Sequence, residues 1–390
     1  MNLTGSLFLA LLAVLTVAAF TGVILLWRRL SKRDWHAVLG RIGVLGGAQL
    51  MVVVLVAALA NDYFGFYGSW HELFGVASAS NETGQNVIGS PAGARVAGRR
   101  HQFVTVEQVS GLNVPGGSAP AVTGQTQDVA IQGAITGLST QAIVYLPPQY
   151  FQPAYAHYRF PAAIISTGYP GDLGALENRL KYPYRLLTGI KGRTDKPIVL
   201  VMTQPSPTSV GGIDTECTNV PGGPQVATFW AQDIPTAIEQ AYPRVAAGPK
   251  AWGLMGDSTG GDCALKVSMM NSDRFAAAVS LSGDYNAPED LTTGDLYQTR
   301  QFRDENDPMW RLRHLPKPPI AVLLASSLSG ESDLPQVLEF ARLTEGTPMR
   351  TSTLLRNEGG HNFATWNAEI APALQWLTNT LASPTPLPQV

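Results

Sequence analysis

The sequence is short of charged residues. Lys, Arg, Asp and Glu make up 14% of its 390 residues and the net charge is −2, whereas an ordinary soluble domain is about a quarter charged. A protein that binds nucleic acid needs a surplus of basic residues to meet the phosphates. This balance therefore excludes nucleic acid as a partner and indicates an unusually apolar part of the chain.

Cysteine is nearly absent as well, because Cys217 and Cys263 are the only two. No Cys–His or His–His pair has the spacing of metal ligands, so we expect neither a metal nor another cofactor. Both cysteines belong to the part of the chain predicted below to face an oxidising compartment, which permits a disulfide. We predict a bridge between them; the alternative is two unpaired thiols.

Charge is missing altogether from residues 5–27 and 42–60, two apolar runs near the N-terminus. About 20 such residues cross a bilayer, so both runs are predicted to be transmembrane helices of an anchor that spans residues 1–75. A cleaved signal peptide is the alternative for the first run, but the basic residues follow it instead of preceding it. The basic cluster from Arg28 to Arg41 places the connecting loop in the cytoplasm. Everything after residue 61 is then outside the plasma membrane.

The rest of the chain divides by composition. Residues 76–125 are rich in Gly, Ser, Ala and Pro and are predicted to be an extracytoplasmic linker, with one possible strand at 102–109. Residues 383–390 are predicted to be a disordered tail. Between them, in residues 126–382, strands alternate with helices, which predicts an α/β domain with a mostly parallel sheet. The active site of such a sheet lies at the carboxyl ends of its strands.

The expected strands and helices of this domain follow from its apolar runs. Strands are expected at 129–135, 141–146, 162–165, 198–202, 252–255, 277–281, 320–324 and 351–355, and helices at 174–187, 228–241, 261–270, 336–343 and 368–381.

The most informative motif is Gly-x-Ser-x-Gly, formed by Gly256, Ser258 and Gly260. A short apolar strand precedes it and a helix-like run follows, which is the pattern of a nucleophile elbow. The turn is so tight that small residues are needed two positions on either side of the serine. The motif therefore predicts Ser258 as a nucleophile displayed above the sheet edge.

A serine hydroxyl needs a base to take its proton and a third group to orient that base. In an α/β-hydrolase the order along the chain is Ser, acid, His, and only His314 and His361 follow Ser258. His361 ends a Gly-Gly-His loop after the last strand, so we predict it as the base. His314 lies in a basic segment and is predicted to be a surface residue.

The acid is expected on the loop after the strand at 320–324, where Glu331 and Asp333 compete. We favour Glu331, because Asp333 is well placed to cap the helix that follows. Asp257 and Asp284 are assigned structural roles. The oxyanion hole needs two backbone N–H groups. Thr259 follows the nucleophile, so its N–H is one expected donor.

The second oxyanion donor is expected on the loop after the strand at 162–165. Tyr169 N–H is the predicted donor on that loop and Gly168 N–H is the alternate. An ordinary Gly-Pro turn would have the same sequence, so the loop could also be without a role in binding.

Together these motifs resemble the esterase family of α/β-hydrolases that includes esterase D-like enzymes and secreted mycolyltransferases. The resemblance covers roughly residues 126–382 and rests on the segments 161–171 and 253–261, the Glu331 loop and the Gly-Gly-His361 motif. It extends to membrane-anchored bacterial members through the aromatic stretch 61–70 and the segment 214–223. The family implies Ser258 as nucleophile, Glu331 as acid and His361 as base. One departure is His361-Asn362-Phe363, where mycolyltransferases carry His-Ser-Trp.

The sequence thus predicts a membrane-anchored extracytoplasmic serine esterase that hydrolyses carboxylic esters through an acyl-enzyme. Its expected partners are an ester or acyl-lipid substrate and the membrane. One alternative is an acyltransferase, similar to mycolyltransferases, that moves an acyl group to an envelope glycan or lipid. Another is a catalytically silent envelope-binding module on the same fold. The oligomeric state does not follow from the sequence.

Overall fold

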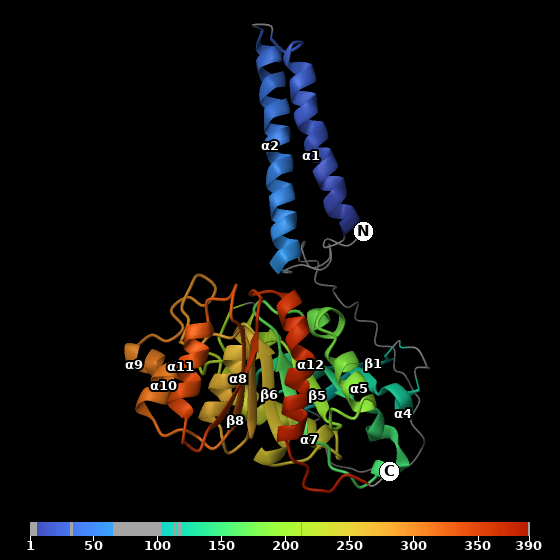
Figure 1. Cartoon of the computed structure of the whole chain (residues 1–390), viewed down its shortest axis with the longest axis vertical. Coiled ribbons are helices and arrows are strands. Elements are labelled where there is room, and N and C mark those ends of the chain that lie inside the picture. Colours follow the sequence, from blue (N-terminus) through green and yellow to red (C-terminus); the bar gives the residue numbers. More distant parts are fainter. Residues whose placement is uncertain are drawn as a thin grey trace. The chain divides into compact units, whose positions relative to one another are not determined.

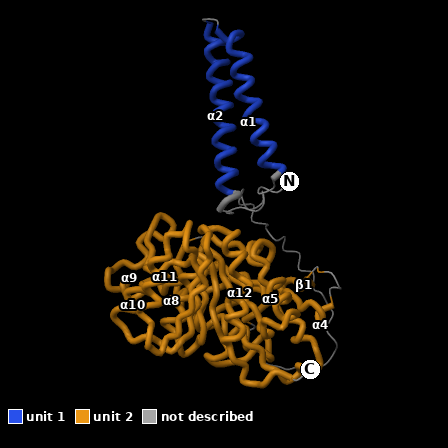
Figure 2. The backbone as a smooth tube through the Cα atoms, in the orientation of Figure 1, with its two compact units in different colours: residues 1–98 blue, residues 99–390 orange. Residues whose placement is uncertain are grey.

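The computed structural model describes residues 6–31, 34–64, 103–112, 114, 119–211 and 213–388. The chain divides into two compact units, residues 1–98 and residues 99–390 (Figure 2). The aromatic segment 65–70 and much of the predicted linker 76–125 lie outside the described residues.

Two apolar helices make up the described part of the first unit. Helices α1 (Ser6–Trp27) and α2 (Trp35–Phe64) run side by side (Figure 1), and the hydroxyl of Thr16 on α1 reaches the carbonyl oxygen of Met51 on α2. Most of their large apolar side chains are exposed within the unit, whereas a helix in a soluble core buries its apolar face. Both helices have the length and composition to cross a membrane. The predicted first span matches α1, while the predicted second span lies inside the longer α2.

A β-sheet flanked by helices forms the centre of the second unit (Figure 1). It has nine strands, in the order β1-β2-β3-β5-β4-β6-β7-β8-β9. The pairs from β1 to β5 across β2 and β3 are antiparallel, and all pairs from β5 to β9 are parallel. The strands are β1 (Val104–Gly111), β2 (Gln125–Gln132), β3 (Ser139–Leu146), β4 (Ala162–Ser166), β5 (Val199–Thr203), β6 (Trp252–Asp257), β7 (Ala277–Leu281), β8 (Ala321–Ser327) and β9 (Arg350–Arg356). All eight expected strands are present, and the predicted α/β-hydrolase fold with a mostly parallel sheet is confirmed.

Helices connect the strands and cover both faces of the sheet. The α-helices of this unit are α4 (Pro120–Thr123), α5 (Tyr182–Lys191), α6 (Val226–Thr228), α7 (Ile234–Ala241), α8 (Thr259–Met270), α9 (Arg300–Glu305), α10 (Pro308–His314), α11 (Leu334–Thr344) and α12 (Phe363–Thr380). Helices α9 and α10 were not among the expected elements. α10 carries His314, which is exposed as predicted and stacks on Trp310.

The core lies in layers on the two faces of the sheet, because successive strand residues point to opposite sides. On β4, Ala162 and Ile164 pack into the layer that contains α7 and α8. Their neighbours Ala163 and Ile165 pack into the layer that contains α5 and α12. The central parallel strands are buried on both faces, which explains why they read as continuous apolar runs in the sequence.

The ordered domain extends beyond both ends expected from composition. Strand β1 lies inside the predicted linker, at the position of the one strand foreseen there, and pairs with β2. At the other end, the hydroxyl of Ser383 donates to the carbonyl oxygen of Arg159 at 2.6 Å. The backbone N–H of Arg159 in turn donates to the hydroxyl of Thr385 at 2.8 Å. The start of the predicted disordered tail is therefore attached to the domain.

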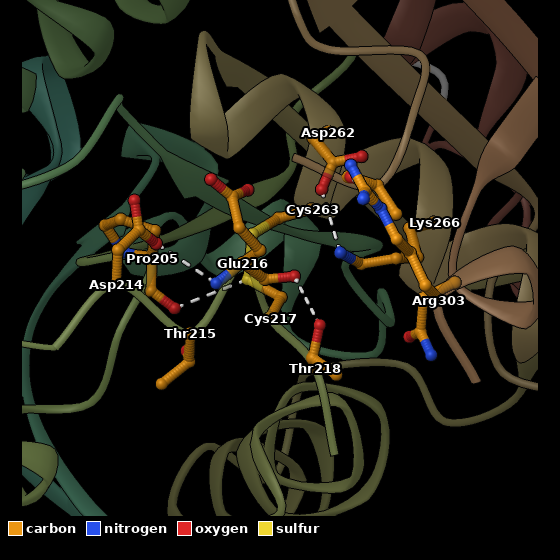
Figure 3. Close-up of polar contacts among 12 residues, drawn as sticks. Pro205, Asp214, Thr215, Glu216, Cys217, Thr218, Asp262, Cys263, Lys266 and Arg303 are labelled. Atoms are coloured by element: carbon orange, nitrogen blue, oxygen red, sulfur yellow. Dashed lines mark hydrogen bonds and ion pairs between the residues drawn. A yellow bond between two sulfur atoms is a disulfide. The ribbon is translucent and has the colours of Figure 1, made fainter. Parts of the chain in front are cut away.

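One disulfide crosses the fold. Cys217, in the long loop after β5, is bonded to Cys263 in the second turn of α8 (Figure 3). Both residues are fully buried. The bridge joins two positions 46 residues apart in the sequence, so it closes a long loop in the unfolded chain and lowers the entropy of that state.

We expect the double variant C217A/C263A to lose stability. Loop-closure entropy for this separation corresponds to about 4 kcal/mol of unfolding free energy. Urea unfolding of the detergent-solubilised full chain, followed by tryptophan fluorescence, measures the loss. A reductant should lower the midpoint of the wild type only. An equal midpoint for the wild type and the double variant would contradict the prediction.

Candidate active site

The turn at Ser258 joins strand β6 directly to helix α8. Ser258 has φ 53° and ψ −128°, a conformation that non-glycine residues rarely adopt and that costs about 1–3 kcal/mol. The surroundings are as tight as the sequence motif requires. A Cβ on Gly256 would lie 2.4 Å from the carbonyl of Gly260, and one on Gly260 would lie 2.7 Å from the carbonyl oxygen of Ser166. Only glycine fits at both positions. The tight turn between them holds Ser258 in its strained backbone conformation.

The structure brings His361 to this serine. The Nε2 atom of His361 lies 2.9 Å from the Oγ atom of Ser258, across 103 residues of sequence. His361 is on the loop between β9 and α12, and the first turn of α12 fixes this loop. The side chain of Asn362 accepts hydrogen bonds from the backbone N–H groups of Ala364 and Thr365. At this distance a neutral imidazole can accept the hydroxyl proton.

The surroundings of His361 favour the neutral form of its imidazole. Partial removal from water lowers the pKa of His361 below its ordinary value, while the nearby carboxylates of Asp284 and Glu331 act in the opposite direction. The indole of Trp366 packs edge-on against the imidazole, with the ring centroids 5.1 Å apart. The ring is thus both oriented and partly desolvated by α12.

The expected acid, Glu331, lies beside the pair without a direct hydrogen bond to the imidazole among the described residues. Its Oε1 atom accepts a hydrogen bond of 2.6 Å from the hydroxyl of Ser282. The Asp284 carboxylate is also near enough to act on the pKa of His361, and its effect is the larger of the two carboxylate effects. The sequence assigned Asp284 a structural role only, so its position is a new element of the site.

Asp333 does not do what the sequence suggested. Its side chain makes no capping bond to helix α11. Instead it accepts a hydrogen bond of 2.7 Å from the hydroxyl of Ser326, at the end of β8, and burial raises its pKa to about 6. The expectation of a helix cap was therefore wrong, because the carboxylate turns back toward the strand end.

Ser282 is a site residue that the sequence analysis missed. It follows the last residue of β7 and has φ 48°, in the left-handed region. Besides donating to Glu331, its hydroxyl accepts a hydrogen bond of 3.1 Å from the indole N–H of Trp366. One buried hydroxyl thus connects the acid to the aromatic residue that packs on the base. The only feature of the sequence that could have indicated Ser282 is its position directly after a parallel strand.

The loop after β4 passes close to the nucleophile. A Cβ on Gly168 would lie 2.8 Å from the Cβ of Ser258, so the backbone of residues 167–169 runs beside the serine. The N–H of Gly168, the alternate oxyanion donor, is directed at the carboxylate of Asp257 at 3.3 Å, and the hydroxyl of Thr167 donates to the same oxygen at 2.7 Å. Asp257 therefore holds the loop in place, and burial raises its pKa to about 7.

The predicted oxyanion donors come from two different segments, because Thr259 directly follows Ser258 and Tyr169 belongs to the loop after β4. Thr259 is the first residue of α8, where backbone N–H groups have no partner within the helix. Tyr169 follows Gly168 and precedes Pro170 through a cis peptide bond. No group of three or more His, Cys, Asp or Glu side chains able to hold a metal ion occurs in the described part of the chain.

The comparisons with known proteins agree with this geometry. Residues 133–377 match the model of the family described as "Putative esterase". No curated protein matches the chain. Among solved structures, the chain resembles a ferulic acid esterase, with a TM-score of 0.57 and 16% identity over 67% of this chain and 99% of the other.

Two further solved structures have the same fold. One is an S-formylglutathione hydrolase from Agrobacterium tumefaciens, with a TM-score of 0.55 and 14% identity over 67% of this chain and 97% of that one. The other is FphF, a fluorophosphonate-binding serine hydrolase from Staphylococcus aureus, with a TM-score of 0.50 and 16% identity over 66% and 99% of the two chains. The family match covers well over half of the chain, and on it the chain belongs to the esterase family and is a carboxylic-ester hydrolase.

Proposed function

We propose that the protein is a membrane-anchored serine esterase that acts outside the plasma membrane through an acyl-enzyme. The observation that carries the proposal is the 2.9 Å approach of the His361 imidazole to the Ser258 hydroxyl. That hydroxyl stands on a strained turn beside a loop of backbone N–H groups. This is the arrangement in which a serine becomes a nucleophile.

In the first half of the reaction, Oγ of Ser258 attacks the ester carbonyl while Nε2 of His361 takes its proton. The carboxylate of Glu331 stabilises the imidazolium that forms, and Ser282 holds that carboxylate in place. The N–H groups of Thr259 and Tyr169 donate to the oxyanion. His361 then returns the proton to the alcohol oxygen as the bond to the acyl carbon breaks.

In the second half, water replaces the alcohol. His361 takes a proton from the water as the water oxygen attacks the acyl carbon. The second oxyanion then collapses, the bond between the acyl carbon and Oγ breaks, and His361 returns the proton to Oγ, which releases the acid and restores the hydroxyl of Ser258. A hydroxyl group of another molecule in place of water would give acyl transfer. Product analysis with and without a sugar acceptor separates the two outcomes.

The anchoring part of the proposal rests on α1 and α2. Both helices are long and apolar enough to cross a bilayer, and the residues between them are basic, which favours the cytoplasmic side for that connection. The catalytic unit then follows on the outer side. The disulfide Cys217–Cys263 supports this side, since such bonds persist in oxidising compartments.

We expect Ser258→Ala to abolish both turnover and labelling. Removal of the serine from such a triad costs about 10⁶-fold in kcat, so hydrolysis of p-nitrophenyl acetate should fall to the background rate. A membrane-impermeant fluorophosphonate probe should label the wild type on intact cells. Ser272→Ala, beyond the far end of α8, is the matched control. Full labelling of Ser258→Ala would remove the serine mechanism, and labelling of the wild type only after lysis would reverse the proposed topology.

We expect the pH profile of kcat/KM to report the pKa of His361. The base must be neutral, so kcat/KM should rise with pH and level off above an apparent pKa below about 6.5, the ordinary value for histidine. Asp284→Asn removes a charge that raises the pKa of His361, so the pH profile of this variant should shift to lower pH.

We expect the loss of kcat to identify the acid. Glu331→Gln should lower kcat by about 10³–10⁴-fold, and Asp333→Asn should lower it much less. A larger loss in Asp284→Asn than in Glu331→Gln would assign the acid to Asp284.

We expect Ser282→Ala to lower kcat by about 10–100-fold with little change in KM, because the acid and Trp366 lose their shared partner. Ser282→Gly is the matched control for backbone strain, since glycine relieves the positive φ while also lacking the hydroxyl. Both variants should lose activity to a similar extent, although Ser282→Gly should be the more stable. Normal kcat in Ser282→Gly would show that the hydroxyl has no part in positioning.

A further inference from the structure

A cavity of about 420 Å³ opens at the carboxyl edge of the sheet, away from His361. It lies between the β2–β3 turn, the long loop after β5 and the loop after β7. We call it the apolar pocket. Its apolar lining consists of Leu138, Val210, Ile213, Val220, Pro224 and Leu296. The volume falls within the range of about 300–1,000 Å³ that small-molecule sites occupy.

The character of this pocket is that of a site for a hydrocarbon group. Leu296 is buried, whereas Ile213 at the rim is 51% exposed. None of the lining residues is basic, and Asp295 is the only acidic one. An apolar group that enters such a pocket gains about 25 cal/mol for each Å² removed from water. An anionic group would be repelled by Asp295 and would find no basic residue in the lining.

The wall of the pocket is firmly connected to the nucleophile helix (Figure 3). Thr215 lines the pocket, and Cys217, two residues further on, is bonded to Cys263 of α8 with a Cα–Cα distance of 5.4 Å. Cys263 is five residues after Ser258, roughly 7 Å along the helix axis. The loop is also braced at Thr215, whose N–H donates to the hydroxyl of Ser206 at 3.0 Å.

The wall is also connected to the loop that carries the proposed oxyanion donor. Burial raises the pKa of the Tyr169 phenol, and the nearby carboxylate of Asp214, next to Thr215, acts in the same direction. The side chain of Gln204, just after β5, donates to the carbonyl oxygen of Gly171 at 2.5 Å. The loop that forms the pocket wall is therefore hydrogen-bonded to the oxyanion loop through Gln204.

The strand order decides which half of an ester this pocket can receive. Along the carboxyl edge, the parallel strands end in the order β5, β4, β6, β7, β8 and β9. Four of the loops that follow these strands matter here, those after β5, β4, β6 and β9. They carry the pocket wall, the oxyanion loop, Ser258 and His361 respectively. His361 must protonate the leaving alcohol, so the alcohol lies on the β9 side of the serine. We therefore expect the acyl group on the other side, toward β5, whose following loop supplies most of the pocket lining.

We propose that the apolar pocket binds the acyl chain of the substrate, and that the enzyme prefers esters of medium-length aliphatic acids over acetate. This inference rests on the proposed serine mechanism, because it takes the position of the scissile carbonyl from Ser258 and His361. The alcohol half of the substrate contributes nothing to binding in the pocket.

The test compares p-nitrophenyl esters from acetate to decanoate on the detergent-solubilised full-length protein, with the partition of each ester into the micelles measured as a control. We expect kcat/KM of the wild type to rise by up to about fourfold for each added methylene, until the pocket is full. Val210→Trp fills the pocket and Ile213→Asp places a charge at its exposed rim. Both should lower kcat/KM for octanoate by at least about tenfold and leave acetate within about threefold.

Leu338→Trp, at a half-exposed position of α11 outside the pocket, is the matched control and should keep the wild-type profile. A second series of acetate esters with longer alcohols should be affected equally little in all variants. If Val210→Trp unfolds the protein, Ile213→Asp becomes the deciding variant, because the side chain at position 213 is at the surface and its substitution should not disturb the fold.

The outcomes separate this inference from the proposed function. Flat acyl-chain profiles that neither variant changes, with acetate hydrolysed and Ser258 labelled, would overturn the pocket and leave the esterase mechanism intact. A selective loss with long alcohols in the two variants would also overturn it, since the pocket would then hold the alcohol. Failure of the wild type to hydrolyse any ester or to react with the fluorophosphonate would instead remove the proposed function.

Discussion

The whole site depends on one tight contact, the passage of the backbone from β6 into α8 beside the end of β4. Gly256 and Gly260 touch, and Gly260 rests against the carbonyl of Ser166, so no side chain larger than hydrogen fits at either position. The strained conformation of Ser258 persists because the buried strand and the buried helix on either side of it fix its ends. The hydroxyl is therefore in place before any substrate arrives, as preorganised catalysis requires.

Around that turn lie one buried acid, Asp257, and two half-buried acids, Glu331 and Asp333, and each accepts hydrogen bonds from different residues. Asp257 receives a hydroxyl and a backbone N–H from the β4 loop, so its burial holds the proposed oxyanion loop next to the serine. Glu331 receives the hydroxyl of Ser282, and Asp333 receives that of Ser326. These hydroxyls end neighbouring parallel strands, β7 and β8. A charged acid at such a site costs desolvation energy unless it is hydrogen-bonded, and the strand-end serines supply those bonds.

Sequence reasoning reached the parts of the fold and site that local patterns encode. The elbow at Ser258 is a contiguous motif, and the buried parallel strands are continuous apolar runs. His361 was found because the fold fixes the order of the motifs along the chain. The roles of Ser282 and Asp284 were not found from the sequence. Ser282 comes close to Glu331, and Asp284 close to His361, only when β7, β8 and β9 pair in register. The direction of the Asp333 side chain likewise depends on Ser326 across the strand end, and a helix-capping pattern cannot show it.

The loop that follows β5 has little regular structure, and long-range interactions fix its conformation where it lines the apolar pocket. Glu216 and Cys217 both have positive φ, which is unfavourable for non-glycine residues. Burial, with the carboxylates of Asp262 and Asp214 nearby, raises the pKa of Glu216 to about 10, so it is neutral at pH 7 and adds no charge beside the buried Lys266–Asp262 pair. The disulfide to α8 then fixes the strained residues covalently. Because Thr215 belongs to the same loop, the shape of the apolar pocket and the position of the nucleophile helix are set by one piece of the structure.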